Sequence, residues 1–192
     1  MYAGGWDRII LSGAPGSEEL EGLSIAELAE GAGKDPFPVV FDLIGKTRGS
    51  ASMVVFSMSD DDVEAILAYP RTCIGSDGIP ARGKVHPRLF GTFPRVLGLY
   101  AGEKRLLALE EAVRRMTSLP AGVLGLKDRG VIKEGCRGDM VIFNREAVRD
   151  AADYAEPRRY PEGITHVFVN GKAVILDGEL KAERAGRVLL KA

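Results

Sequence analysis

The sequence predicts an α/β fold that is followed by a small β unit. Three short β-rich runs, at residues 8–11, 53–56 and 72–75, alternate with helical patterns, as strands and helices do in parallel βα units. Beyond residue 125 the hydrophobic period changes, and Asn170-Gly171 separates two β-rich runs. This dipeptide is the strongest short signal of a β-hairpin. We therefore expect an α/β region over residues 1–128 and a β region over residues 129–192.

The helices of the first region are predicted by their start signals. Ser24 and Glu27 have the spacing of a capping box, which predicts a helix from residue 25. Asp35-Pro36 opens a second helix, because proline is favoured at the first helical position. Ser59 precedes three aspartates, an arrangement typical of a capped helix N-terminus. Two more helices are expected at residues 93–100 and 108–116.

The second region contains three predicted strands. The first covers residues 140–143, and the other two, at 167–169 and 173–175, form the hairpin around Asn170-Gly171. A polar, arginine-rich stretch from 145 to 161 connects the first strand to the hairpin. The sequence contains no internal repeat and no low-complexity segment.

The charge and composition restrict the partners. The chain has 192 residues, with 26 basic and 27 acidic side chains, so no net field attracts nucleic acid or an anionic membrane. No apolar run approaches the roughly 20 residues that span a bilayer, and the first residues lack the pattern of a signal peptide. We expect a cytoplasmic protein whose partners are small molecules or proteins. Cys73, expected inside a buried strand, and Cys136 are interpreted as reduced thiols.

Asp77, His86 and Arg88 are the candidate site residues. Asp77 follows the predicted strand 72–75, and catalytic groups of α/β barrels lie at the carboxyl ends of strands; an ordinary turn aspartate is the alternative. Arg88 lies in the following loop, where it is either an anion-binding group or a solvated cation. His86 either caps a backbone carbonyl or contacts substrate.

Several motifs occur in one order along the chain: Ile74-Gly75-Ser76-Asp77-Gly78, His86-Pro87-Arg88, residues 91–98 and 116–121, then residues 124–130 and 160–164. Together they resemble the D-aminoacylase family, the N-acyl-D-amino-acid deacylase branch of the amidohydrolase superfamily. The resemblance covers nearly the whole chain, and it is specific because so many motifs keep the family's order and spacing.

The resemblance implies a metal-dependent (β/α)₈ barrel with a small β-sandwich domain. Residues 1–128 then correspond to the C-terminal part of the barrel, and residues 129–192 to a C-terminal segment of the β domain. By the same resemblance Asp77 contacts the zinc-bound water and is the general base, Arg88 binds the α-carboxylate of an N-acyl-D-amino acid, and His86 contributes to substrate binding.

The chain departs from the family in its metal ligands. The family's histidine and cysteine ligands lie on earlier strands, whereas this sequence contains two histidines, His86 and His166. A catalytic zinc normally has three protein ligands, so we expect the chain alone to retain no zinc and to be inactive. It would be a truncated form, one subunit of a split enzyme or a remnant.

A partial barrel would expose strand edges and apolar surface. We therefore expect this chain to bind the missing N-terminal barrel half or a second copy of itself. Two alternatives to a deacylase portion stay open: a non-catalytic association module, and part of a cyclic amidohydrolase similar to dihydroorotase or hydantoinase. The motif that contains Arg88 argues against the cyclic amidohydrolase.

Overall fold

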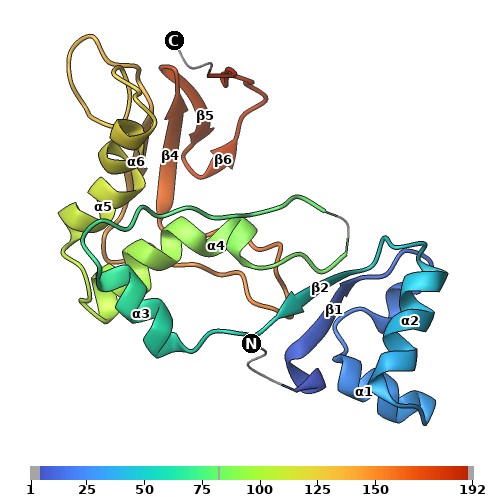
Figure 1. Ribbon diagram of the computed structural model, residues 1–192. Coiled ribbons are helices and arrows are strands. Elements are labelled where there is room, and N and C mark those ends of the chain that lie inside the picture. Colours follow the sequence, from blue (N-terminus) through green and yellow to red (C-terminus); the bar gives the residue numbers. More distant parts are fainter. Residues whose placement is uncertain (1–4, 82, 190–192) are drawn as a thin grey trace. The chain divides into compact units, whose positions relative to one another are not determined.

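The computed structural model describes residues 5–81 and 83–189, which form two compact units (Figure 1). Unit 1 contains residues up to Ala65, the segment Asp77–Phe90 and the segment Ala152–Arg159. Unit 2 contains Ile66–Ser76, Gly91–Ala151 and the residues from Tyr160 onward. Each unit therefore combines segments that are distant in the sequence. The predicted division after residue 128 stays a prediction.

Unit 1 is built on a two-stranded sheet. Strand β1 (Ile9–Gly13) pairs antiparallel with β2 (Ser52–Val55), and Ile10 lies opposite Val54. The parallel arrangement expected from the alternating pattern is wrong for this pair. Two helices connect the strands, α1 (Ile25–Ala32) and α2 (Pro36–Lys46), so the chain returns to the end of the sheet that it left.

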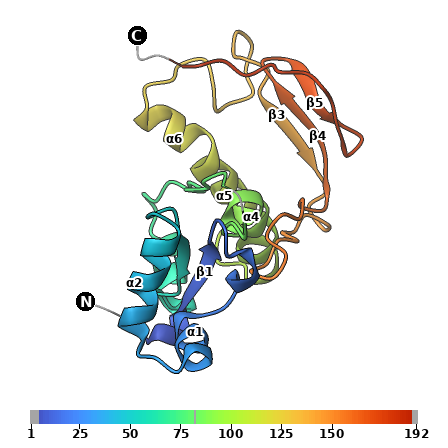
Figure 2. The same ribbon diagram turned by 90° about the vertical axis from the view of Figure 1, so that its right-hand side faces the viewer.

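The helices of unit 1 begin where the sequence predicts. The Ser24 hydroxyl accepts the Glu27 N–H at 3.1 Å, and the Glu27 carboxylate accepts the Ser24 N–H at 2.7 Å, which confirms the capping box. Pro36 occupies the first turn of α2. Helices α1 and α2 lie beside β1 (Figure 2), and together they enclose the core of unit 1. Its buried members are Ile9, Leu11, Ala14, Ile25, Ala29, Val39 and Leu43.

The strand expected at residues 72–75 is not formed. These residues have irregular backbone, and the Ile74 N–H donates to the Arg115 carbonyl oxygen at 3.0 Å. The composition of the run suits a strand, but a strand needs a neighbour to pair with, and none pairs with it within residues 5–81 and 83–189. Cys73 is exposed as a result, so its interpretation as a buried core residue is wrong.

Helices form the remainder of the first predicted region. Helix α3 (Asp60–Ala68) follows Ser59, and α4 (Arg88–Arg95) continues into a π-helical segment, Val96–Glu103. The helix predicted at residues 93–100 therefore begins earlier and ends later. Helix α5 (Leu109–Met116) matches the prediction at 108–116, and the short α6 (Ser118–Val123) follows it. No described helix is both long and apolar enough to cross a membrane.

The β region of unit 2 is an antiparallel sheet in the order β3-β4-β5-β6. Its strands are Met140–Phe143, Ile164–Val169, Lys172–Leu176 and Glu179–Leu180. Asn170 and Gly171 both have positive φ, 51° and 79°, as a two-residue hairpin turn requires. The predicted hairpin is therefore confirmed.

Arg115 holds the segment that leads toward Asp77. Its side chain is 3% exposed and donates to the carbonyl oxygens of Leu67 and Tyr69 at 2.5 and 2.7 Å and to Glu111 at 2.6 Å. The neighbouring Arg114 also binds Glu111, but its side chain is 41% exposed. Hydrogen bonds from Arg114 and Arg115 lower the pKa of Glu111 to about 2.

We predict that Arg115→Ala lowers the free energy of unfolding by about 3 kcal/mol, because a buried guanidinium and its three hydrogen bonds to Leu67, Tyr69 and Glu111 are lost. Arg114→Ala removes the exposed neighbour on the same carboxylate and should have only a slight effect. Urea denaturation of the wild type and both variants measures this difference. Equal destabilisation by the two substitutions would contradict the assigned role of Arg115.

Candidate functional site

Asp77 occupies a strained turn that brings it beside helix α4. Its φ is +46°, in the left-handed region that non-glycine residues rarely adopt. The next residue, Gly78, lies so close to the helix that a Cβ atom would be 2.9 Å from the Leu89 Cα atom. Only glycine fits there without displacement. The Asp77-Gly78 pair thus fixes the carboxylate next to the first turn of α4.

Arg88, the first residue of α4, pairs with Asp77. The Arg88 Nη2 atom lies 2.7 Å from the Asp77 Oδ2 atom. The Asp77 side chain is 78% exposed and that of Arg88 is 38% exposed, so both groups are accessible to a ligand. The structure therefore brings together, within unit 1, the two residues, eleven positions apart, that the sequence predicted as acid and cation.

His86 lies at the same helix end. Its Nδ1 atom accepts the Arg88 backbone N–H at 3.0 Å, and its Nε2 atom lies 3.3 Å from the Tyr154 Oη atom. Of the two alternatives for His86, the ring does form a backbone cap, but to an N–H group and not to a carbonyl oxygen, because the first N–H groups of a helix have no partner within it. The predicted substrate contact stays a prediction. Desolvation and the Arg88 charge lower the pKa of His86, and the Asp77 charge opposes this shift.

The sequence analysis missed two residues of this environment. Tyr154 packs on Phe56 with a ring-centroid distance of 4.6 Å, and both line a mainly apolar cavity of about 360 Å³ in unit 1. Tyr154 lies in the polar stretch interpreted as a connection, and no local pattern distinguishes it there. Phe56 was expected only as a strand residue.

The described residues do not fit a catalytic zinc. Between residues 5 and 189, residue 82 apart, no three His, Cys, Asp or Glu side chains are grouped closely enough to hold a metal ion. Asp77 faces a guanidinium, and His166 lies in β4, 3.4 Å from Asp177. A zinc site needs about three protein ligands. The prediction that Asp77 contacts a metal stays a prediction.

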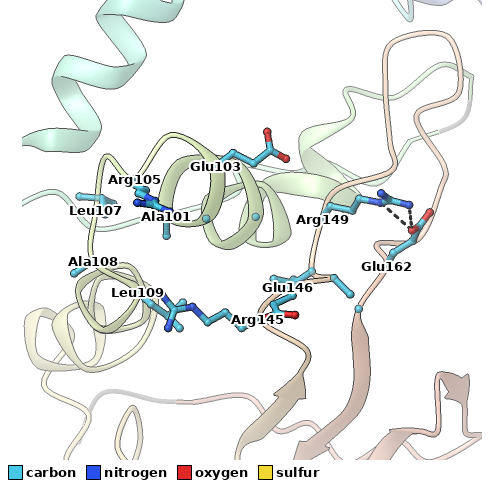
Figure 3. Close-up of a pocket in the computed structure, with 15 residues that line it drawn as sticks. Ala101, Glu103, Arg105, Leu107, Ala108, Leu109, Arg145, Glu146, Arg149 and Glu162 are labelled. Atoms are coloured by element: carbon cyan, nitrogen blue, oxygen red, sulfur yellow. Dashed lines mark hydrogen bonds and ion pairs between the residues drawn. The ribbon is translucent and has the colours of Figure 1, made fainter.

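Unit 2 has a larger hollow of about 1050 Å³ (Figure 3). Its lining alternates in charge: Arg105 and Arg145 lie with Glu103 and Glu146, and Arg149 donates to Glu162. None of the predicted site residues lines it. The candidate site therefore stays with Asp77, His86 and Arg88 in unit 1.

Comparison with known proteins identifies the family. The sequence profile described as "Amidohydrolase family" matches residues 11–175. The chain belongs to the amidohydrolase family. It is 40% identical over 191 residues to the D-aminoacylase of Alcaligenes xylosoxydans xylosoxydans, an alignment that covers 96% of this chain and 38% of that protein. The N-acyl-D-glutamate deacylase of the same organism is 39% identical over 183 residues, 95% of this chain and 36% of that protein.

Solved structures support the same assignment. A D-aminoacylase crystal structure matches with a TM-score of 0.88 and 40% identity, over 94% of this chain and 37% of that chain. The N-acyl-D-glutamate deacylase of Bordetella bronchiseptica, solved with zinc and a phosphonate inhibitor, matches with a TM-score of 0.88 and 37% identity, over 99% of this chain and 39% of that chain. The chain thus spans less than two fifths of these relatives. These matches confirm the predicted fold class, part of an amidohydrolase barrel with strands of a β domain.

The lowered pKa of His86 predicts a pH-dependent stability. The folded state favours the neutral ring, whereas the unfolded ring titrates near 6.5. As pH falls through 6.5, the unfolded state takes up protons first, and the stability of unit 1 decreases. The melting temperature of the wild type should therefore drop more between pH 7.5 and 5.5 than that of His86→Asn. His166→Asn is the control, and an identical pH dependence of all three proteins would contradict the prediction.

Proposed function

We propose that this chain supplies a proton-accepting carboxylate and a carboxylate-binding guanidinium to an N-acyl-D-amino-acid deacylase. The observation that carries the proposal is the 2.7 Å contact between Asp77 and Arg88, both accessible, at a turn that leaves no room for a side chain at position 78. Similarity to three deacylases of N-acyl-D-amino acids supports this substrate class.

Asp77 is suited to accept a proton. Amide hydrolysis requires a base that takes the proton of the attacking water and an acid that returns a proton to the leaving amine. A carboxylate that is 78% exposed, as that of Asp77 is, can do both in sequence. We assign this role to Asp77, whose carboxylate is held 2.7 Å from Arg88.

Arg88 is suited to bind the α-carboxylate of the substrate. A guanidinium has five N–H donors in a planar fork and binds carboxylates through two parallel hydrogen bonds. The contact with Asp77 shows that the group is oriented for a carboxylate oxygen. Because the substrate's carboxylate and scissile amide are separated by a single carbon atom, a carboxylate on Arg88 brings the amide near Asp77.

The metal of the reaction is assigned to other parts of the complete barrel. The N-acyl-D-glutamate deacylase structure contains zinc, and the D-aminoacylase relative has a binuclear metal centre. The described residues of this chain do not fit such a centre. We therefore propose that deacylase activity requires the remaining barrel strands, as a further segment or as a separate chain.

A chimaera tests the role of Asp77. We predict that replacing the matching 38% of the Alcaligenes D-aminoacylase by this chain gives an active enzyme. Asp77→Asn in the chimaera should lower kcat by about a thousandfold, because the base is lost. Asp61→Asn, an exposed aspartate of α3, is the matched control. If Asp77→Asn retains the turnover of the control, Asp77 is not the base.

The same chimaera tests the role of Arg88. Arg88→Ala should raise KM for N-acetyl-D-amino acids by about a hundredfold, because a bidentate charged contact is lost. The matching N-acetyl-D-amino-acid amides, which lack the carboxylate, should be unaffected. An equal rise of KM for both substrate series would refute the binding of the α-carboxylate by Arg88. Hydrolysis of a cyclic ureide in preference to both series would favour the cyclic amidohydrolase.

A non-catalytic association module is the second candidate, and one observation favours it. Helix α2 exposes Phe37, Phe41 and Ile44, with exposed fractions of 63%, 70% and 48%, at the spacing of one helix face. Contiguous apolar surface of this kind marks interaction sites.

We predict that the chain self-associates through this face. Analytical ultracentrifugation of the wild type should show a dimer that Phe41→Glu disrupts, and Glu30→Gln on the exposed side of α1 serves as the control. A wild-type chain that remains monomeric at 100 µM, a concentration of the order at which weak interfaces form, would contradict self-association.

A further inference from the structure

A short segment far along the chain contacts the loop that precedes Arg88 and leads into α4. This clasp segment comprises residues 153–158. The Asp153 carboxylate accepts the N–H groups of Ala155 and Glu156 at 2.9 and 2.6 Å, and Pro157 is buried. An aspartate that binds backbone groups two and three residues ahead forms a stable turn of its own. The clasp segment therefore has a defined shape.

The clasp segment contacts the loop at two places. Arg158 donates through Nη2 to the carbonyl oxygens of Ala81 and Gly83, at 2.5 and 3.2 Å. Tyr154 reaches His86, 68 positions earlier, with its hydroxyl 3.3 Å from Nε2. Phe56, the residue after β2, packs against Tyr154 with its ring tilted by 56°. Both contacts lie within unit 1.

Strand β1 holds the same loop independently. The Lys84 N–H donates to the Ser12 carbonyl oxygen at 2.8 Å. Gly83 is so close to β1 that a Cβ atom would lie 2.7 Å from the same oxygen. Strand β1 thus fixes the loop at Lys84. The clasp segment fixes it at Gly83 and again at His86.

The contact with the Arg88 N–H determines which nitrogen of His86 carries the proton, and the Tyr154 hydroxyl oxygen gives that proton an acceptor. Nδ1 accepts the Arg88 N–H, so in the neutral ring it has no proton, and the ring proton is on Nε2. Nε2–H then donates to the Tyr154 hydroxyl oxygen. A proton on Nδ1 instead would place two N–H groups against each other and remove the cap from α4. An oxygen at the position of Tyr154 favours the tautomer that holds the Arg88 backbone.

We propose that residues 153–158 position Arg88, with Tyr154 acting through the His86 tautomer and Arg158 through the loop backbone. Tyr154 and Arg158 are therefore positioning residues for the carboxylate-binding group. The inference depends on the proposed function only for what Arg88 binds, since the tautomer and the loop order are properties of the chain without substrate.

Nuclear magnetic resonance of the isolated chain tests the role of Tyr154. Long-range ¹H–¹⁵N spectra at pH 7.5 distinguish the two neutral tautomers, and the chain has only two histidines. The wild type should show His86 with its proton on Nε2. Tyr154→Phe should shift His86 toward the Nδ1–H tautomer and speed amide exchange at Arg88 about fivefold, the factor that one hydrogen bond contributes. Tyr154 is 48% exposed, so the substitution leaves no buried cavity.

Tyr69→Phe is the control, because Tyr69 is 60% exposed and belongs to unit 2. An unchanged His86 tautomer and an unchanged Arg88 exchange rate in Tyr154→Phe, as in Tyr69→Phe, would overturn the role of Tyr154. These readouts need no turnover. If the chimaera lacks deacylase activity, the expected His86 tautomer and Arg88 exchange rate of the isolated chain stay the same.

A second variant tests Arg158. Arg158→Gln should speed amide exchange over residues 83–88 about fivefold, and Arg158→Lys should restore part of the protection because it keeps one donor. Arg159→Gln, which removes the ion pair with Glu156, is the matched control. Equal exchange rates in Arg158→Gln and Arg159→Gln would overturn the role of Arg158.

Discussion

The ion pair between Asp77 and Arg88 is the interaction on which the candidate site depends. It exists because Asp77 accepts a left-handed backbone and because Gly78 allows the chain to pass against α4. Any side chain at position 78 would clash with the backbone of Leu89, so the turn or the helix would have to shift. A strained backbone maintained beside a charged pair is typical of functional sites. The surrounding contacts of His86 and the clasp segment then fix the helix end that carries Arg88.

The parts of this structure that are local in sequence could be predicted from the sequence. The capping box of Ser24 and the Asn170-Gly171 hairpin each depend on residues within four positions, and both are formed. Pairing is not local. The run 72–75 has the composition of a strand but lacks a neighbour among the described residues, and β1 and β2 pair antiparallel because two helices connect them.

The same distinction between local and long-range features applies to the candidate site. Asp77, His86 and Arg88 lie within twelve positions and carry family motifs, so the sequence could single them out. The partner of His86 could not be found by such reasoning, because Tyr154 is 68 positions away in a stretch without periodicity. The direction of the His86 contact was also beyond the sequence, since a histidine nitrogen donates or accepts according to the group that it meets. Here it meets a helix N–H.

We propose that this chain supplies the base, Asp77, and the carboxylate-binding group, Arg88, and that other parts of the barrel supply the metal ligands. The measurement that tests this division most directly is the zinc content of the purified chain by inductively coupled plasma mass spectrometry, together with turnover of an N-acetyl-D-amino acid. The account predicts no stoichiometric zinc and no turnover for the chain alone. Bound zinc at one equivalent with measurable turnover would contradict it, since the chain would then assemble a complete site by itself.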